Sequence, residues 1–280
     1  MATMNNAYQF SDFIRSHGYE PKSDVIAGKW IRFGRKAAIS ARLYDDELGG
    51  YLHDWRTGEK FYWFADKDRM SPSEYVRRKQ ESDALKQAQD AKRSLAYADA
   101  SRTAEKLFND APIASHNHPY LARKKVNPYG IKQLNGELLI PVYSIQGDMQ
   151  SIQFIDESGN KKFLKDGKMS GGCHFIGEIA MDKPVYICEG YATALSVYED
   201  TKCLTLIAFN AGNLINVAKG LRAQLPDIEI VIAGDCDGVG QKYAEKASKA
   251  VNGSTLIPNF GDHPQGFTDW NDYFNHWVTV

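Results

Sequence analysis

The sequence lacks long hydrophobic runs and closely spaced cysteines. No apolar stretch approaches the roughly 18 residues that span a bilayer. The first residues, MATMNNAYQFSDF, contain no charged segment followed by an apolar one, as a secretory signal would. Cys173, Cys188, Cys203 and Cys236 lie far apart without a CxxC pair, which argues against a zinc ribbon and a disulfide scaffold. These absences predict a reduced, cytoplasmic protein without membrane partners.

The sequence also lacks a P-loop of the form GxxxxGK[ST]. The stretch KDGKMS at residues 165–170 has neither the first glycine nor the spacing. We therefore expect no helicase motor in this chain, so that unwinding would need a helicase acting in trans.

Net charge is close to zero, at −1, but the two signs are unevenly distributed. Residues 1–170 carry 27 Lys and Arg against 22 Asp and Glu, whereas residues 171–280 carry 7 against 13. A basic part beside an acidic part suits a protein that holds a polyanion in one and metal cations in the other. Chance segregation of surface charge would give the same pattern.

Composition and periodicity divide the 280 residues into four parts. Residues 1–70 predict a small β-rich domain, with a helix over 8–20 and an antiparallel sheet over 29–64. Residues 71–112 predict one long, charged connecting helix, and residues 113–182 predict a basic α+β subdomain. Residues 183–280 alternate apolar strands with helices, which predicts an α/β fold, Rossmann-like, whose mainly parallel sheet has helices on both faces.

Acidic residues follow the predicted strands of the last part. Glu189 and Gly190 end the first strand, residues 210–213 (NAGN) end the second, and Asp235–Cys236–Asp237 ends the third. Because ligands bind at the carboxyl ends of such strands, the carboxylates should share one rim, where hard oxygen ligands favour Mg²⁺ or Mn²⁺. Each piece taken alone is most often a turn, and the ordered combination from Glu189 to Asp237 is what makes the pattern specific.

Three segments then resemble the motifs of a Toprim domain over residues 183–275. They are VYICEGYATALSV, FNAGN and VIAGDCDGVG. HPYLARKKV is similar to the YLxxRG segment of bacterial-type primases, and LLIPVYSIQGDMQSIQFID with KKFLKDGKMSGGCHFIG is similar to their basic subdomain. FTDWNDYF resembles a KDWND segment, with Thr268 where Lys is common. The whole pattern resembles the Toprim DNA primases of plasmids and phages, which include conjugative-plasmid primases and phage primase–helicases.

This resemblance implies an enzyme, a DNA primase. It would be a nucleotidyltransferase that makes short RNA primers on a single-stranded DNA template from ribonucleoside triphosphates, with two Mg²⁺ or Mn²⁺ ions, in plasmid or phage replication. Asp235 and Asp237 would then be metal ligands, and Glu189 a ligand or the group that manages the proton of the attacking hydroxyl. Asp269, with Asp272 as a further candidate, would complete the catalytic rim, although Asp269 could instead be the N-cap of the last helix.

The resemblance also implies a nucleotide-binding set. Lysine is a suitable partner for phosphate, and a solvated basic strand is the alternative. The set comprises Lys124, Lys125, Lys161, Lys162 and Lys165, with Gly190, Gly212 and Asn213 at the strand ends. Gln153 stands where the family carries an arginine.

Residues 29–64 occupy the place of the zinc ribbon of bacterial primases, without its cysteines. Bases stack on aromatic rings while basic groups follow phosphates, so we expect this sheet to bind single-stranded DNA. The candidates are Trp30, Arg32, Lys36, Trp55, Arg56 and Trp63, with Tyr62 among the neighbouring aromatics. About half of these aromatic side chains are expected to form the core of the small domain instead.

Three other functions compete with a primase. A topoisomerase needs a tyrosine on a separate cleavage domain, for which the chain has no room. A Toprim nuclease uses similar carboxylates, but it would not need the polymerase-like segment 117–176. A non-catalytic replication accessory protein that binds DNA would not need every acidic position, and all are present.

Overall fold

The computed structural model describes residues 6–65, 72–261 and 266–276, without the side chains of Lys36, residues 72–86 and Gln89. The chain forms two compact units, Met1–Gln87 and Ala88–Val280, and the boundary falls within helix α2 (Pro72–Asp110). Among the described residues, no helix combines the length and the apolar character needed to cross a membrane.

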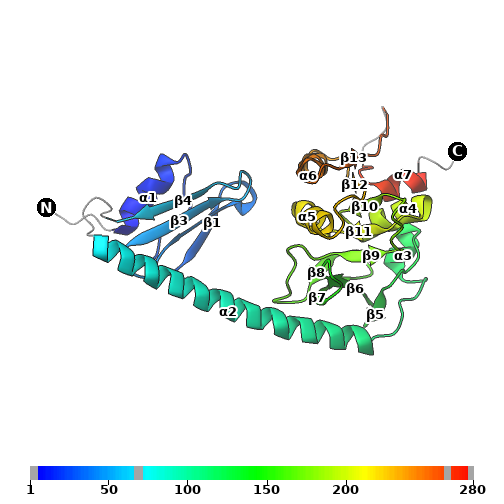
Figure 1. Cartoon of the computed structure of the whole chain (residues 1–280), viewed down its shortest axis with the longest axis horizontal. Coiled ribbons are helices and arrows are strands. Elements are labelled where there is room, and N and C mark those ends of the chain that lie inside the picture. Colours follow the sequence, from blue (N-terminus) through cyan, green and yellow to red (C-terminus); the bar gives the residue numbers. More distant parts are fainter. Residues whose placement is uncertain (1–5, 66–71, 262–265, 277–280) are drawn as a thin grey trace. The chain divides into compact units, whose positions relative to one another are not determined.

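The N-terminal unit is a helix packed on a four-stranded antiparallel sheet (Figure 1). Its elements are α1 (Asn6–Ser16), β1 (Trp30–Phe33), the short 3-10 helix η1 (Arg35–Ala37), β2 (Ile39–Leu43), β3 (Gly49–Asp54) and β4 (Lys60–Phe64). The strands pair in chain order, with Trp30 opposite Arg42 and Leu52 opposite Phe61. The antiparallel sheet expected over residues 29–64 is therefore confirmed.

Alternation along the strands sets the two faces of this sheet. Phe33, Ile39 and Leu52 are buried and pack against Phe10 of α1. The helix approaches very closely at Gly50, where a Cβ atom would lie 2.3 Å from the Phe10 ring. Glycine at this position is thus needed for the packing of α1 on the sheet.

The C-terminal unit contains two sheets. The first has five strands in the order β13-β12-β10-β11-β9, all parallel except β9, and the second is antiparallel in the order β5-β6-β7-β8. The strands are β5 (Lys132–Leu134), β6 (Glu137–Tyr143), β7 (Met149–Ile155), β8 (Lys161–Phe163), β9 (His174–Ile176), β10 (Val185–Cys188), β11 (Thr205–Ile207), β12 (Ile230–Ala233) and β13 (Ser254–Leu256). The helices are α3 (Pro119–Lys124), α4 (Tyr191–Thr201), the 3-10 helix η3 (Ala211–Asn213), α5 (Leu214–Gln224), α6 (Gly238–Ala250) and α7 (Trp270–His276).

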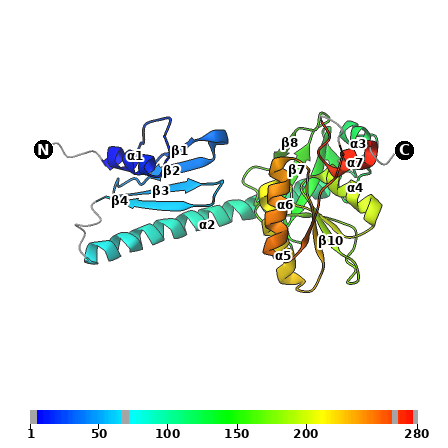
Figure 2. The same cartoon turned by 90° about the horizontal axis from the view of Figure 1, so that it is seen from above.

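Helices cover both faces of the mainly parallel sheet, as its apolar strands predict. Figure 1 and Figure 2 show α5 and α6 on one side of the unit and α3, α4 and α7 on the other. Ile187 and Ile232 face the α5–α6 side, whereas Cys188 and Ala233 belong to the core that includes α4 and Trp270. The expected mixed α/β fold class is therefore confirmed.

The antiparallel sheet β5–β8 has two differently covered faces. Leu139 and Ile152 pack against Ala104 of α2 and against Ala111, which directly follows that helix. The opposite face, which includes Leu138, joins the core that contains α3 and α4. Strand β8 forms one edge of this sheet. Because side chains alternate along a strand, those of β8 face the α2 side and the α4 side in turn.

Candidate active site

The predicted acidic residues lie on one rim of the parallel sheet. Strands β10 and β12 are direct neighbours, and Cys188 pairs with Ala233. Glu189 and Asp235 follow these strands by one and two residues, so both lie at their carboxyl ends. We call Glu189, Asp235, Asp237 and Asp269 the carboxylate rim.

Mutual repulsion and burial shift the pKa values on the carboxylate rim. The pKa of Asp235 rises to about 7, first because the side chain is buried and then because Glu189, Asp269 and Asp237 are close. Burial also raises the pKa of Glu189, with a further rise from Asp237, whereas Lys161 and the backbone N–H of Ala211 act in the opposite direction. These negative groups thus lie close enough to destabilise one another when no cation is near.

The chemistry of the rim fits a hard divalent cation. Asp235 Oδ1 is buried and accepts no hydrogen bond from the described residues. Among those residues, no three His, Cys, Asp or Glu side chains are gathered closely enough to hold one ion by themselves. Mg²⁺ usually takes only one or two carboxylates and fills its remaining positions with water and substrate phosphates, so the rim suits this mode of binding.

Asp237 also caps helix α6. Its Oδ1 accepts hydrogen bonds from the backbone N–H groups of Val239 and Gly240. The loop is tight here, since a Cβ atom on Gly240 would lie 2.9 Å from the carbonyl oxygen of Asp235. One oxygen of Asp237 is thus used by the fold, and Oδ2 is left for a ligand.

Asp269 lies directly before α7, in the N-cap position given above as the alternative to a catalytic role. Its Oδ1 accepts a 2.8 Å hydrogen bond from the backbone N–H of Asp272. The ammonium of Lys124 lies between the two carboxylates, 3.8 Å from Asp269 Oδ2 and 3.7 Å from Asp272 Oδ1. Nearby, the Cys236 N–H donates to Thr268 O at 2.8 Å, so the two acidic loops are joined through backbone atoms.

Lys161 is, beside Lys124, a predicted basic residue that the structure places at the rim. A Cβ atom on Gly190 would lie 3.7 Å from Lys161 Nζ. Although part of the long side chain is exposed, burial around the ammonium lowers its pKa, while Glu189, Asp269 and Asp235 raise it. A positive charge is therefore held beside the carboxylate rim, where it could contact a phosphate.

The other predicted nucleotide-binding residues are spread more widely. Lys162 points to the other face of β8, where its Nζ lies 2.8 Å from Glu137 Oε1 and above the Phe154 ring. Asn213 is buried, and its side chain bonds the backbone of Gly171, Gly172 and Ala208. Lys125, which follows α3 with a positive φ, Lys165 and Gly212 are exposed.

The predicted DNA-binding residues of the N-terminal unit fall into different environments. Trp30 and Trp55 are more than half exposed, and Arg32 is also exposed. Trp63 instead faces α1, with its ring centroid 5.6 Å from that of Phe10, and Arg56 is held by the buried carboxylate of Asp54. The side chain of Lys36 lies outside the described residues.

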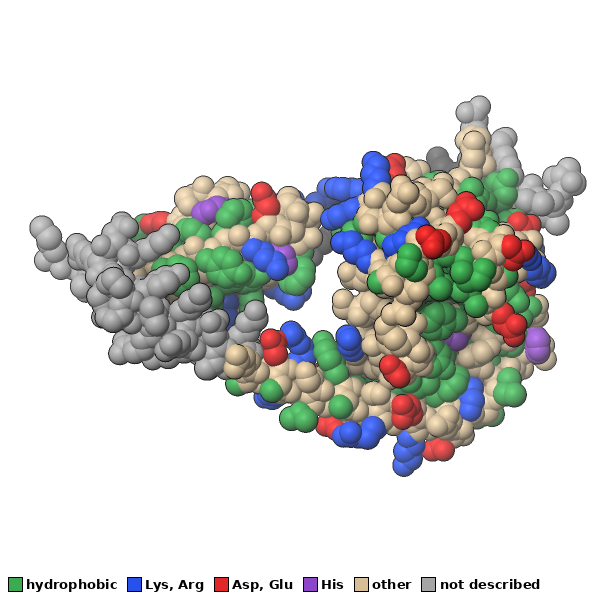
Figure 3. Space-filling model, viewed as in Figure 1, with side chains coloured by type: hydrophobic (Ala, Val, Ile, Leu, Met, Phe, Trp, Pro, Cys, Tyr) green, Lys and Arg blue, Asp and Glu red, His purple; other side chains and the backbone are tan. Residues whose placement is uncertain are grey.

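The face of this sheet opposite α1 carries two rows of side chains, of which the sequence indicated only Trp30, Arg32 and Tyr62. We call it the outer face. Across the strands, the register places Trp30, Arg42, Tyr51 and Tyr62 in one row and Arg32, Ser40, His53 and Lys60 in the next. Figure 3 shows hydrophobic, basic, acidic and histidine side chains on the visible part of this unit. Period-two counting from the apolar Ile39 would have placed Ser40 and Arg42 on this face.

The outer face is aromatic and basic. The Tyr51 ring lies 5.2 Å from that of Tyr62, and the Arg42 guanidinium lies 6.0 Å from the centre of the Trp30 ring. Neither row contains a carboxylate, although Asp45 in the following turn pairs with Arg42 at 3.1 Å. Exposed rings next to cations match the requirements of a single-stranded nucleic acid.

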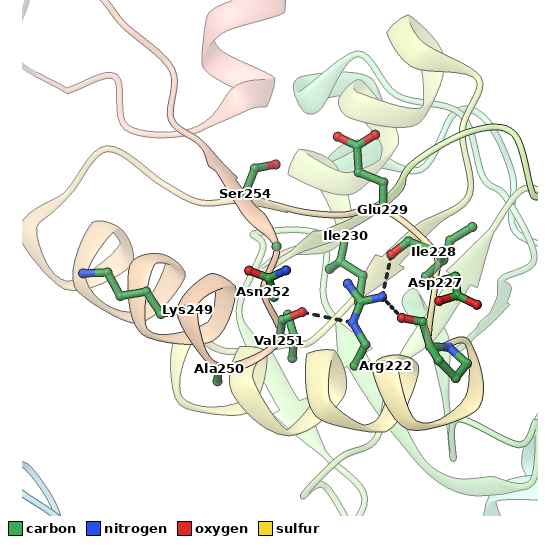
Figure 4. A pocket seen from close by; sticks show the side chains of 12 residues that line it. Arg222, Asp227, Ile228, Glu229, Ile230, Lys249, Ala250, Val251, Asn252 and Ser254 are labelled. Carbon is green, nitrogen blue, oxygen red and sulfur yellow. Dashed lines mark hydrogen bonds between the residues drawn. The ribbon is translucent and has the colours of Figure 1, made fainter.

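A cavity in the C-terminal unit lies away from the carboxylate rim. It measures about 730 Å³ and is lined by residues at the beginnings of β12 and β13, at the amino ends of the parallel strands. Figure 4 shows the guanidinium of Arg222 within it, donating hydrogen bonds to the carbonyl oxygens of Val251, Pro226 and Ile228. Because the guanidinium of Arg222 already holds three backbone carbonyl groups of the fold, we assign the cavity a structural role.

Comparisons with known proteins agree with the resemblance seen in the sequence. Residues 184–277 match the family described as Toprim domain. Two proteins of Escherichia coli, both named DNA primase TraC, are 32% identical over 243 residues and 31% identical over 283 aligned residues. These alignments cover 81% and 90% of this chain but only 23% and 19% of the relatives, so the chain spans about a fifth of their length.

Two solved structures are more distantly similar. The primase fragment of the bacteriophage T7 primase-helicase protein is 17% identical, with a TM-score of 0.40, over 52% of this chain and 61% of that one. The zinc-binding and RNA polymerase domains of the Aquifex aeolicus primase are 9% identical, with a TM-score of 0.44, over 98% of this chain and 83% of that one.

Proposed function

We propose that this chain is the catalytic part of a DNA primase, which makes short RNA primers on single-stranded DNA by nucleotidyl transfer. The observation that carries this proposal is the carboxylate rim, which lies in a segment that matches the Toprim domain. Most of this chain, 81% of its residues, is also similar to part of DNA primase TraC. The chain also retains the basic segment before the rim, which supplies Lys161. Ribonucleoside triphosphates and a DNA template strand are the substrates.

Glu189, Asp235 and Asp237 are the proposed metal-holding residues, with Mg²⁺ or Mn²⁺ as the cation and Asp269 completing the catalytic group. Such ions stabilise negative charge on a transferred phosphoryl group and on the leaving pyrophosphate. Glu189 is either one of the metal ligands or the carboxylate that receives the proton of the attacking 3′-hydroxyl. Lys161 supplies positive charge to the triphosphate from the other side of the rim.

The other predicted nucleotide-binding residues divide into those that we keep in the proposed site and those that we assign to the fold. Lys124, Lys125, Lys165, Gly190 and Gly212 are kept in the proposed nucleotide-binding set. Lys162 and Asn213 are engaged elsewhere, as described above, so we propose that they support the fold around the site. A helicase partner in trans also stays a prediction.

We further propose that the outer face of the N-terminal sheet binds the single-stranded template. Its exposed rings can stack on bases, and its three strand cations, Arg32, Arg42 and Lys60, can follow the phosphates. Trp30, Arg32 and Trp55 of the predicted set remain in this proposal. Trp63 and Arg56 are left out because they serve the core and the buried Asp54.

Primer synthesis on single-stranded DNA with labelled ribonucleotides and Mg²⁺ or Mn²⁺ tests the catalytic proposal. Short RNA products should appear with the wild-type chain and disappear with Asp235→Asn and Glu189→Gln. Asp227→Asn is the matched control, because Asp227 is an exposed acidic residue at the amino ends of the strands, away from the rim. Cleavage of the template without synthesis would identify a nuclease instead.

Binding of a labelled oligothymidylate in excess chelator tests the outer face without the metal site. Trp30→Ala and Tyr62→Ala should each weaken binding by about 1–3 kcal/mol, the usual value for one stacked base. Tyr8→Ala is the control, since Tyr8 is 53% exposed on α1, which covers the other face of the sheet. Equal loss in all three variants, or in none, would contradict this role.

A further inference from the structure

Strand β8 presents a basic and an aromatic side chain toward the carboxylate rim. Lys161 and Phe163 lie two residues apart in this strand, so they share one face. That face is the one opposite Lys162, which turns toward Glu137 and Phe154. Phe163 is 37% exposed, which leaves much of a large apolar ring uncovered.

Phe209 contacts Phe163 from the neighbouring sheet. Strand β11 ends at Ile207, and Phe209 is the second residue after it. The N–H of the intervening Ala208 donates to Cys188 O at 2.8 Å, so Phe209 lies beside Glu189 at the strand ends. The Phe163 and Phe209 rings meet edge to face, with centroids 5.9 Å apart and an interplanar angle of 82°. The ring of Phe163 is thereby fixed on one side while its other surface stays accessible.

The backbone of Phe209 adopts a costly conformation. Its φ is +68°, in the left-handed region that a bulky side chain rarely occupies. The preceding carbonyl of Ala208 accepts a 2.9 Å hydrogen bond from the buried amide of Asn213, which helps to hold this turn. Conformations of this kind persist where the surroundings enforce them, and they cluster at ligand sites.

We propose that Phe163, braced by Phe209, contacts the base of a nucleotide whose phosphates are held by Lys161. This inference rests on the proposed nucleotidyl transfer. Residues two apart in a strand are separated by about 7 Å, and the sugar of a nucleotide separates base from phosphate by a comparable span. Stacking depends little on base identity, so this contact accepts any base and leaves selection to the template.

The test compares two ligands that differ in whether they carry a base. Calorimetry measures the Kd of the full chain for ATP and for inorganic tripolyphosphate, both with Mg²⁺. The wild type should bind ATP more tightly, and Phe163→Ala should weaken ATP binding about tenfold without changing the Kd for tripolyphosphate. Phe163→Trp should bind ATP like the wild type, because it keeps an aromatic surface.

Two lysine variants separate the base contact from the phosphate contact. Lys161→Ala should weaken both ligands, whereas Lys162→Ala should change neither, because its ammonium is paired with Glu137 on the other face. Phe163→Leu, with its thermal unfolding measured alongside, keeps an apolar side chain without a ring. It should also lose the preference for ATP while remaining folded.

Several results would overturn the inference. They are a wild type that binds ATP no more tightly than tripolyphosphate, a Phe163→Ala variant that weakens both ligands equally, and a Phe163→Leu variant that keeps the preference. Primer synthesis by the wild type together with any of these results would refute the base contact alone. Absence of primer synthesis, with ATP binding still dependent on Phe163, would refute the primase and leave the base contact standing.

Discussion

His174 should make the C-terminal unit less stable in mild acid. This side chain is buried in β9, with its ring 6.2 Å from that of Tyr143 and 6.3 Å from that of Tyr191. Burial lowers the pKa of His174 from its ordinary value of 6.5 to about 4, so the folded protein keeps the ring neutral. The unfolded chain takes up a proton near pH 6.5, which the folded chain does not do until near pH 4.

The sign and size of the effect follow from this difference in pKa. Between these two values the unfolded state binds more protons, so the free energy of unfolding falls as the pH falls. Complete titration of a difference of roughly 2.5 units corresponds to about 3 kcal/mol, and the part developed between pH 7.5 and pH 5.0 is about 2 kcal/mol.

Urea unfolding at the two pH values measures this loss in the wild type and in His174→Gln, whose side chain stays neutral. Effects of all other groups are common to both proteins, so the wild type should lose about 2 kcal/mol more than the variant. His116→Gln is the control, because His116 is an exposed histidine of the same unit. If wild type and His174→Gln lose equal stability, the buried neutral histidine is the wrong explanation.

Two further predictions concern the other unit and the tight acidic loop. Arg56 holds the pKa of the buried Asp54 well below its ordinary value, so Arg56→Ala should lower the free energy of unfolding at pH 7, and the deficit should shrink below pH 4. Urea unfolding followed by tryptophan fluorescence measures both, and an undiminished deficit in acid would contradict this explanation. Gly240→Ala places a Cβ atom against the carbonyl oxygen of Asp235 and should reduce primer synthesis about tenfold or more. Gly238→Ala is the control and should keep activity, because no atom lies within 4 Å of its Cβ. Equal activities of the two variants would show that the loop tolerates the added Cβ atom at Gly240.

The fold class was predictable because long-range order follows from local patterns. Apolar strands separated by helices require a parallel sheet covered on both faces, and the residues that end those strands must then share one edge. This reasoning places Glu189 and Asp235 at the ends of neighbouring strands, as the structure does. Their roles as metal ligands stay predictions.

The faces of short or wholly aromatic strands were harder to predict. In KFYWF every residue from 61 to 64 is aromatic, so hydrophobicity could not show that Trp63 faces inward and Tyr62 outward. In KKF, Lys161 and Lys162 are chemically identical, and only the pairing of β8 with β7 shows which of the two faces the rim. The strained turn at Phe209 has no signal in the sequence at all, because it depends on contacts made by Asn213.

The edge position of β8 has a consequence for solubility. An edge strand exposes backbone groups that could pair with a strand of another copy and start aggregation. Here Lys161 and Lys162 place a charge on both faces of a strand of only three residues. Any approaching strand would therefore meet a lysine on whichever face it packed, which protects this edge while leaving one of the two ammonium groups beside the rim.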